Sequence, residues 1–275
     1  LMAWLPEALG RADQYQRDQS VGQHDLFGGA EVAADTEPMP ILDEWDELDR
    51  LQEEKDTLGL YLTGHPINRY LDELARFTSS RIADLVIDSP TPMGDGDGDA
   101  PRRRVPEKQI VIAGLVVEVR TRNGRSGRMA FVTLDDRSGR IEVALFAKEY
   151  ETYGHLLGND KILVVSGSLG FDAFSGQMRV RVEEVFDLEQ ARARYARCLL
   201  LELRSDQLMG GESDKLAEIL LPFRDGGCPV VVRYSSSHAQ ATLRFGDDWK
   251  VLPTDSCLAR LRHFAGDHAV SIQYV

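Results

Sequence analysis

Cysteine is scarce in this sequence. Cys198, Cys228 and Cys257 are the only three among 275 residues, and they lie far apart. They form no CxxC pair and no metal-ligand spacing with the six histidines, which argues against a zinc site or a disulfide framework. We therefore expect buried thiols in a reducing cytoplasm. A continuous apolar run of about 18 residues is also missing, so the sequence predicts no membrane-spanning helix.

Patterns of catalytic residues are missing as well. The sequence has no clustered Ser/His/Asp set, no glycine-rich phosphate loop and no metal-ligand spacing. The Asp-Gly repeats at 94–99 lack the spacing and the closing Glu of an EF-hand loop. Asp135 and Asp136 lie at the end of an expected strand, where forming a turn explains them. The sequence therefore predicts no catalytic residue, no metal site and no cofactor.

Positive charge is in deficit overall but is concentrated in one region. The formal net charge is −13, from 32 Lys and Arg against 45 Asp and Glu. Residues 1–100 carry 7 basic against 22 acidic side chains, residues 101–146 carry 10 against 5, and residues 147–275 carry 15 against 18. The average argues against general polyanion binding, yet the basic region is local enough to form a positive surface of its own. Solvated charge is the alternative explanation.

Composition and periodicity divide the chain into six segments. The chain begins with Leu rather than Met and lacks a secretory signal, so we expect a piece of a longer protein. The six are the end of an upstream helical region at 1–19, a linker at 20–40, a helical connector at 41–87, a flexible loop at 88–108, a barrel at 109–188 and a small α+β domain at 189–275. Within the connector we expect a helix over 41–62, ended by Gly64 and Pro66, and another over 68–77, capped by Asn68.

Alternation of apolar and polar residues predicts five strands in the barrel segment. They are expected over 110–120, 129–135, 140–146, 161–171 and 177–188, with a helix over 147–157. Three strands, a helix and two strands form the order of an OB-fold, which binds oligonucleotides across strands 2 and 3 and its loops. The predicted fold class is therefore α+β: a helical N-terminal segment, a five-stranded OB-fold barrel and a small α+β C-terminal domain. A barrel without a ligand is the alternative.

The barrel carries side chains suited to single-stranded nucleic acid. Four arginines gather on the first strand, the first turn and the second strand, namely Arg120, Arg122, Arg125 and Arg128. Phe131 and Phe146 lie on strands of the expected platform, where aromatic rings can stack on bases at about 1–3 kcal/mol per base. Their apolar neighbours leave open the alternative that one or both belong to the core. Phe171 and Phe174 lie at the last hairpin.

The terminal segment reads as a compact α+β module. We expect strands over 198–203, 229–234 and 268–275, helices over 189–196, 213–221 and 255–264, and a hairpin that pairs 240–245 with 248–252. Either Thr254 or Asp255 is expected to cap the last helix. Residues 198–275 carry 8 basic and 10 acidic side chains, which favours a protein partner over nucleic acid. The apolar contact candidates are Trp249, Leu258, Leu261 and Phe264, of which Trp249 is favoured, and packing into the module's own core is the alternative for all four.

A short amphipathic peptide stands alone in the acidic linker. It comprises Gln23, His24, Asp25, Leu26 and Phe27. Two adjacent apolar side chains beside a hydrogen-bonding Gln suit docking into a pocket of a partner. The pentapeptide resembles the sliding-clamp-binding motif of bacterial replication proteins, with His24 at the motif's variable position. Packing onto the chain's own surface is the alternative.

Longer stretches carry a second resemblance that covers nearly the whole chain. Residues 59–67 (GLYLTGHPI), 133–140 (TLDDRSGR), 244–246 (RFG) and 249–253 (WKVLP) resemble the C-terminal region of bacterial DNA polymerase III alpha subunits. The loop at 88–108 looks longer and more acidic than that family requires, so no function is carried onto it.

The resemblance implies a set of roles. It implies that Gln23–Phe27 binds the sliding clamp (the beta subunit), that the barrel contacts single-stranded template DNA, and that the last domain docks the tau subunit of the clamp loader. The intact family member is a DNA-directed DNA polymerase, whereas this chain lacks the several carboxylates that hold the two catalytic metals. We therefore expect a non-catalytic, cytoplasmic part of a replicase. The rival hypothesis is a stand-alone OB-fold protein that binds single-stranded nucleic acid.

Overall fold

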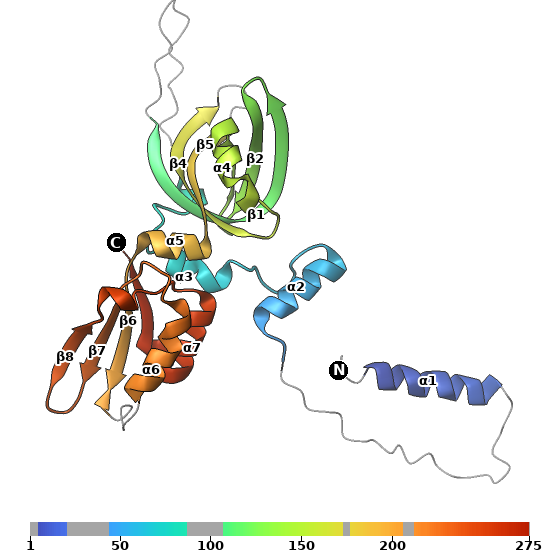
Figure 1. Ribbon diagram of the computed structural model, residues 1–275. Helices are drawn as coiled ribbons and strands as arrows, with labels where there is room; N and C mark the ends of the chain where they lie inside the picture. The colour runs from blue at the N-terminus through green and yellow to red at the C-terminus, as the bar shows by residue number, and fades with distance from the viewer. Residues whose placement is uncertain (1–4, 21–43, 87–106, 173–176, 206–211, 275) are drawn as a thin grey trace, which may run out of the picture. The chain divides into compact units, whose positions relative to one another are not determined.

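The computed structural model of the chain describes residues 5–20, 44–86, 107–172, 177–205 and 212–274 (Figure 1). The chain divides into two compact units, residues 1–64 and residues 65–275. Among the described residues, no helix is both long enough and apolar enough to cross a membrane.

The first unit contains two helices. They are α1 (Leu5–Ser20) and α2 (Glu47–Leu58). Asp46 caps α2, because its carboxylate accepts a hydrogen bond from the Leu48 amide at 3.2 Å. The helix ends at Gly59, which adopts φ +77°, a conformation that favours glycine. Our expectation of a helix over 41–62 was therefore too long at both ends, since residues 44–46 precede the helix. After its C-terminal end, the Glu54 carboxylate accepts hydrogen bonds from the Leu62 and Thr63 amides.

The connector at the start of the second unit is built from short helical turns. They are η2 (Asn68–Tyr70), α3 (Leu71–Leu74) and η3 (Ile82–Asp84). Asn68 was expected to cap a helix over 68–77. The cap is wrong, and the helical turns that begin at Asn68 end at Leu74. The side-chain oxygen of Asn68 instead accepts a hydrogen bond from the Arg137 guanidinium at 2.7 Å, so the amide is used for a contact with the barrel.

Five strands form the predicted OB-fold barrel. They are β1 (Lys108–Gly124), β2 (Gly127–Asp135), β3 (Arg140–Leu145), β4 (Ile162–Asp172) and β5 (Gln177–Asp187). The barrel closes in the order β1-β2-β3-β5-β4; its β3–β5 pair is parallel, and its β1–β2, β1–β4, β2–β3 and β4–β5 pairs are antiparallel. The helix α4 (Ala147–Tyr153) connects β3 to β4 and is shorter than the expected 147–157, because a 3-10 turn over Gly154–Leu156 follows it.

The barrel interior is filled by one side-chain set from each strand. On β2, Ala130, Val132 and Leu134 are buried, while the side chains between them point outward. A β-bulge on β4 and β5 brings two backbones close together at Gly167. A Cβ atom at this position would lie 2.1 Å from the carbonyl oxygen of Arg181, so only glycine fits there.

The terminal domain is a four-stranded sheet with helices on one face. The helix α5 (Leu188–Tyr195) leads from the barrel into β6 (Ala196–Arg204). The sheet order is β8-β7-β6-β9, with β7 (Val230–Ser235), β8 (Gln240–Arg244) and β9 (Val270–Tyr274). Figure 1 shows α6 (Glu212–Leu220) and α7 (Asp255–Ala265) beside this sheet. Thr254 rather than Asp255 caps α7, since its hydroxyl accepts from the Cys257 amide at 3.1 Å.

The hairpin expected between 240–245 and 248–252 is absent from the described terminal domain. β8 pairs with β7, and Asp247–Trp249 forms a 3-10 turn in which the Trp249 amide donates to Gly246. Val251 then forms an isolated bridge with Cys228. The two-residue Gly246–Asp247 motif thus starts a helical turn, because the chain must cross to Cys228 instead of returning along β8.

Two of the three cysteines are buried as expected. Cys228 and Cys257 lie in the terminal core, whereas Cys198 is half-buried. Burial raises the pKa of the Cys228 thiol to about 12 and that of Cys257 to about 11, so both stay protonated at neutral pH. All three are free thiols.

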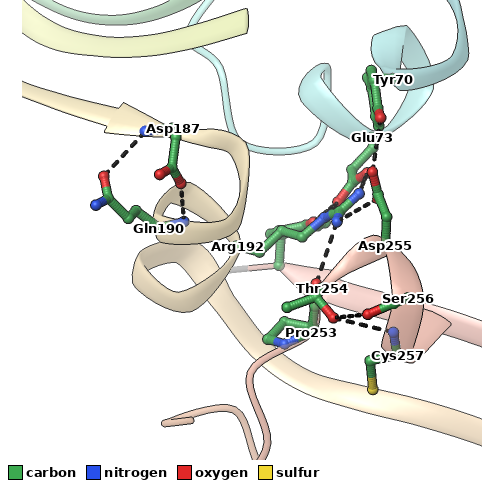
Figure 2. Close-up of polar contacts among 11 residues, drawn as sticks. Tyr70, Glu73, Asp187, Gln190, Arg192, Pro253, Thr254, Asp255, Ser256 and Cys257 are labelled. Atoms are coloured by element: carbon green, nitrogen blue, oxygen red, sulfur yellow. Dashed lines mark hydrogen bonds and ion pairs between the residues drawn. The ribbon is translucent and has the colours of Figure 1, made fainter. Parts of the chain in front are cut away.

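A buried guanidinium connects the connector, α5 and α7 (Figure 2). Arg192 is 2% exposed and donates two hydrogen bonds to the Glu73 carboxylate, at 2.7 and 2.8 Å. A further nitrogen of Arg192 donates to Asp255 at 2.7 Å. Glu73 also accepts from the Tyr274 hydroxyl, and Asp255 accepts from Tyr70 at 2.8 Å. We call these five residues the Arg192 cluster.

The Arg192 cluster fixes the protonation of its members. Burial raises the pKa of Tyr70 to about 12, and the hydrogen bond to Asp255 acts in the same direction. Burial alone would raise the pKa of Asp255, but the hydrogen bonds from Arg192 and Tyr70 outweigh it and lower that pKa. At neutral pH, three of the five members are therefore a charged guanidinium, an ionised Asp255 and a neutral Tyr70 that donates a hydrogen bond to Asp255.

Aromatic packing surrounds the Arg192 cluster. The Phe77 ring stacks on Tyr195 with centroids 5.2 Å apart and lies 4.9 Å from the ring of Tyr274. Phe77 belongs to the connector, Tyr195 to α5 and Tyr274 to β9. Connector, barrel exit and terminal sheet thus share one apolar junction beside the ionic one.

Arg192→Met tests this junction. It should lower the free energy of unfolding by about 3 kcal/mol, because it leaves Glu73 and Asp255 without their cation; half-exposed Asp255 keeps the loss at the low end of the range for buried pairs. Urea unfolding measures the change. Arg194→Met is the matched control on the same helix, where the exposed side chain should contribute less than about 0.5 kcal/mol. Equal losses in the two variants would contradict a structural role for the Arg192 cluster.

Candidate nucleic-acid interface

The four arginines expected to contact nucleic acid lie on one hairpin of the barrel. Arg120 and Arg122 are on β1, and Arg125 lies in the turn between β1 and β2. Arg128 is the second residue of β2 and shares the side of the strand to which Ala130 belongs. All four are exposed. The side chains of Arg122 and Arg125 make no hydrogen bond or ion pair with any residue that the structure describes. Arg128 donates to the Thr121 hydroxyl at 3.1 Å and lies 5.5 Å above the Tyr150 ring.

Phe131 and Phe146 point away from the barrel core. Phe131 is half-buried on the outward side of β2, between the inward-facing Ala130 and Val132. Phe146 follows β3 and is 42% exposed. Neither ring belongs to the buried core, so the core alternative does not apply to them. Phe174 lies outside the described residues, while Phe171 at the end of β4 is exposed.

Two further arginines, which were not among the predicted DNA-binding residues, lie on this surface. The guanidinium of Arg179 lies 5.2 Å above the Phe131 ring, and that of Arg181 lies 5.3 Å above the Phe146 ring. Both arginines are on β5, where they alternate with the buried Val180 and Val182. That alternation is the sequence signal that could have placed them on the outward side of the barrel.

Strand register aligns these side chains in rows across the barrel. One row runs Arg120, Phe131, Ala144 and Arg181, on β1, β2, β3 and β5. The neighbouring row runs Glu118, Thr133, Glu142 and Arg179. We call the outward side of β1, β2, β3 and β5, with the β1–β2 turn, the arginine face.

A groove of about 200 Å³ lies at one side of the arginine face. Small residues contribute to its lining (Ala144, Ser168 and Gly170), together with Phe146, Phe171, Arg179, Arg181 and Glu107. Flat rings and guanidinium groups above small residues suit a stacked base with a neighbouring phosphate. The groove lies over β3, β4 and β5, whereas the four predicted arginines lie on the β1–β2 hairpin.

Asp135 and Asp136 serve the turn between β2 and β3. One oxygen of Asp136 accepts from the amides of Ser138 and Gly139 at 2.8 and 3.0 Å, and the other accepts from the Ile82 amide at 2.8 Å. Burial raises the pKa of Asp135, but the hydrogen bonds from Arg140, at 2.7 Å, and from the Arg137 amide, together with the charge of Arg140, outweigh it, so the net pKa is lowered. Within the described ranges, no group of three or more His, Cys, Asp or Glu side chains is placed to hold a metal ion.

The other expected binding residues lie elsewhere. Gln23, His24, Asp25, Leu26 and Phe27 fall outside the described residues. Trp249 is half-buried against the terminal core, with its ring edge-on to Phe245 and the Arg224 guanidinium 4.7 Å above it.

Two apolar candidates of the terminal domain belong to its core. Leu258 and Leu261 of α7 are buried, so the alternative of core packing is correct for them. Phe264 is partly buried against the same core. Leu221 and Leu243 are the large apolar side chains that the described terminal domain exposes.

Two domain families match parts of the chain. The family described as "OB-fold nucleic acid binding domain" matches residues 110–188, which form the barrel. The family described as "DNA polymerase III subunit alpha, C-terminal domain" matches residues 215–266, within the terminal domain.

Whole-chain relatives are DNA polymerase III alpha subunits. The protein of that name from Escherichia coli (strain K12) is 40% identical over 282 residues, and the one from Vibrio cholerae is 36% identical over 277 residues. The one from Pseudomonas aeruginosa is 38% identical over 278 residues. Each match covers 100% of this chain, but the chain spans only 23%, 22% and 22% of these relatives' lengths.

Solved structures resemble a smaller part of the chain. The second single-stranded DNA binding protein of Mycobacterium smegmatis covers 30% of this chain and is itself covered to 89%, with 15% identity and a TM-score of 0.27. Asparaginyl-tRNA synthetase from Pyrococcus horikoshii also covers 30% of the chain and is covered to 19%, with 25% identity and a TM-score of 0.26.

Proposed function

Because this chain is homologous along its whole length to a part of the bacterial DNA polymerase III alpha subunit, we propose that it is a non-catalytic, DNA-guiding part of a cytoplasmic replicase. The intact protein would be a DNA-directed DNA polymerase. Its active-site carboxylates and metals would lie in the part of the polymerase beyond the matched 22–23%. No cofactor is assigned to the chain.

Single-stranded template DNA is the ligand we propose for the arginine face. The observation that carries this proposal is the pairing of arginine with aromatic side chains, Arg179 over Phe131 and Arg181 over Phe146, on the outward side of an OB-fold barrel. Rings stack on any base and guanidinium groups bind any phosphate, so binding should be independent of sequence. Arg120, Arg122 and Arg125 would extend the phosphate path along the β1–β2 hairpin, whereas Arg128 lies over Tyr150 of α4 on the other side of this hairpin.

Two protein partners follow from the homology and the sequence motif. We propose that Gln23–Phe27 binds the sliding clamp, with Leu26 and Phe27 as the apolar anchors. We also propose that the terminal domain docks the tau subunit of the clamp loader, with Trp249 among its contacts. A net charge of −2 over residues 198–275, together with a half-buried Trp, supports a protein partner for this region.

A stand-alone OB-fold protein that binds single-stranded nucleic acid is the rival function. The Arg192 cluster argues against it, because the barrel's exit helix is tied by buried ionic contacts to the connector and to the terminal domain.

The DNA proposal is tested by salt-dependent binding of a labelled dT oligonucleotide of about 16 nucleotides, the upper site size of one OB-fold. Replacing Arg125 and Arg181 by Gln should weaken binding and lower the log–log salt slope by about 1.4, or about 0.7 per lost phosphate contact. The control replaces Arg194 and Arg197, two exposed arginines outside the barrel strands, with the same loss of charge. An equal fall in the control would contradict a specific role for the arginine face.

The clamp proposal is tested by the double variant Leu26→Ala, Phe27→Ala. Truncating the anchors of a desolvated pocket costs about 2 kcal/mol or more, so clamp affinity should fall at least about thirtyfold. Surface plasmon resonance against purified clamp measures this, with His24→Ala as the control at the variable position. Unaltered affinity in the double variant would refute the proposal.

The tau proposal is tested by Trp249→Ala in the full chain. Deleting the domain would leave Arg192 and Phe77 without their partners, so a single substitution is the sharper test. Calorimetry should show a loss of tau affinity of about thirtyfold, the scale of a binding hot spot, while clamp affinity of the same variant stays unchanged. Retained tau affinity would remove Trp249 from the interface.

A further inference from the structure

A carboxylate occupies the centre of the arginine face. Glu142 lies on β3, and its two oxygens reach different arginines: Oε2 is 2.5 Å from Arg120 Nη2, and Oε1 is 2.5 Å from Arg179 Nη2. The Glu142 side chain is 18% exposed, less than either arginine, so it sits beneath the two guanidinium groups. Arg120 comes from β1 and Arg179 from β5, on opposite sides of this carboxylate in the sheet.

The contact has the form of a phosphate contact. A phosphate group also presents two oxygens to separate guanidinium groups through charge-assisted hydrogen bonds. Glu118 adds a second carboxylate, 3.6 Å from Arg120 Nε. Arg120 and Arg179 are thus already neutralised in the free protein, whereas Arg122 and Arg125 face solvent and Arg181 rests on Phe146.

We propose that Glu142 competes with backbone phosphates for Arg120 and Arg179 and thereby sets a low affinity for single-stranded DNA. This inference rests on the DNA-binding function proposed above. A strand first engages arginines such as Arg122, Arg125 and Arg181, which have no carboxylate partner among the residues that the structure describes. The DNA strand contacts Arg120 and Arg179 only by replacing Glu142. The Glu142 carboxylate must then be hydrated although its side chain is only 18% exposed.

The exchange limits how tightly a strand is held. Displacing Glu142 breaks its hydrogen bond from Arg120 and its ion pair with Arg179, while a phosphate forms similar contacts in their place, so the net gain is small. The ionised carboxylate also remains beside the bound phosphates and repels them. A grip of this kind holds a strand near the barrel while letting the phosphates exchange.

Glu142→Gln, which keeps the size of the side chain and removes its charge, is the test. With the same dT oligonucleotide, affinity at low salt should rise about tenfold, the scale of one hydrogen bond to a charged group. The log–log salt slope should steepen by up to about 1.4, because two more phosphate contacts form.

Glu183→Gln is the matched control. Glu183 is exposed on β5 and accepts a hydrogen bond from Gln109 at 2.9 Å, so this variant changes the net charge equally without releasing an arginine. Its effect on affinity should stay below about twofold, as for a solvent-exposed charge. A gain as large as that of Glu142→Gln would overturn the proposal in favour of a general charge effect.

A second comparison asks whether Glu142 acts through the two arginines. In a background with Arg120→Gln and Arg179→Gln, the gain from Glu142→Gln should disappear, and a persisting gain would overturn the proposal. Thermal unfolding checks the fold of each variant, and Glu142→Thr, which suits a strand, replaces Glu142→Gln if the latter unfolds.

The outcomes separate this inference from the function beneath it. If the unaltered chain binds the oligonucleotide and Glu142→Gln binds equally or more weakly, the competition proposal fails and the DNA-binding function stands. If neither the unaltered chain nor Glu142→Gln binds at low salt, the DNA-binding function fails and the inference fails with it.

Discussion

Burying the guanidinium of Arg192 imposes a requirement that organises the second unit of the chain. A cation with 2% exposure is stable only when anions and further hydrogen bonds surround it. No element of the second unit supplies all of them. Glu73 comes from the connector, Asp255 from α7 and Tyr274 from β9, while the Pro253 carbonyl accepts a further bond at 3.3 Å. Segments up to 201 residues apart must therefore meet for the charge to be accommodated.

Strand alternation gives the barrel two chemically different sides. The side chains of Ala130, Val132 and Leu134 fill the interior, and the residues between them on β2 are left for the surface. The same alternation on β5 sends Val180 and Val182 inward and Arg179 and Arg181 outward. A single requirement, a packed barrel core, thus also produces the array of cations and rings on the opposite side.

The regular part of this architecture was predictable from the sequence, because period-two patterns mark strands and cap residues mark helices. All five barrel strands and the Thr254 cap are of this kind. The failures involve long-range contacts. Asn68 has the chemistry of a cap but binds Arg137, and the segment after Gly246 has the pattern of a hairpin but crosses to Cys228. Arg179 and Arg181 were not predicted because they lie outside the basic region at 101–146. They join the other arginines only because the closed barrel places β5 beside β3.

The Arg192 cluster also has a mechanical consequence. The chain passes from the barrel to the terminal sheet through α5. From that helix, the side chain of Arg192 contacts Glu73 of the connector and Asp255 of α7. A pull on the terminal sheet is therefore carried by an ionic and aromatic junction instead of by a loose tether. Rotation of the terminal sheet against the barrel would break the buried contacts of Arg192 with Glu73 and Asp255, so this junction opposes independent rotation of the two.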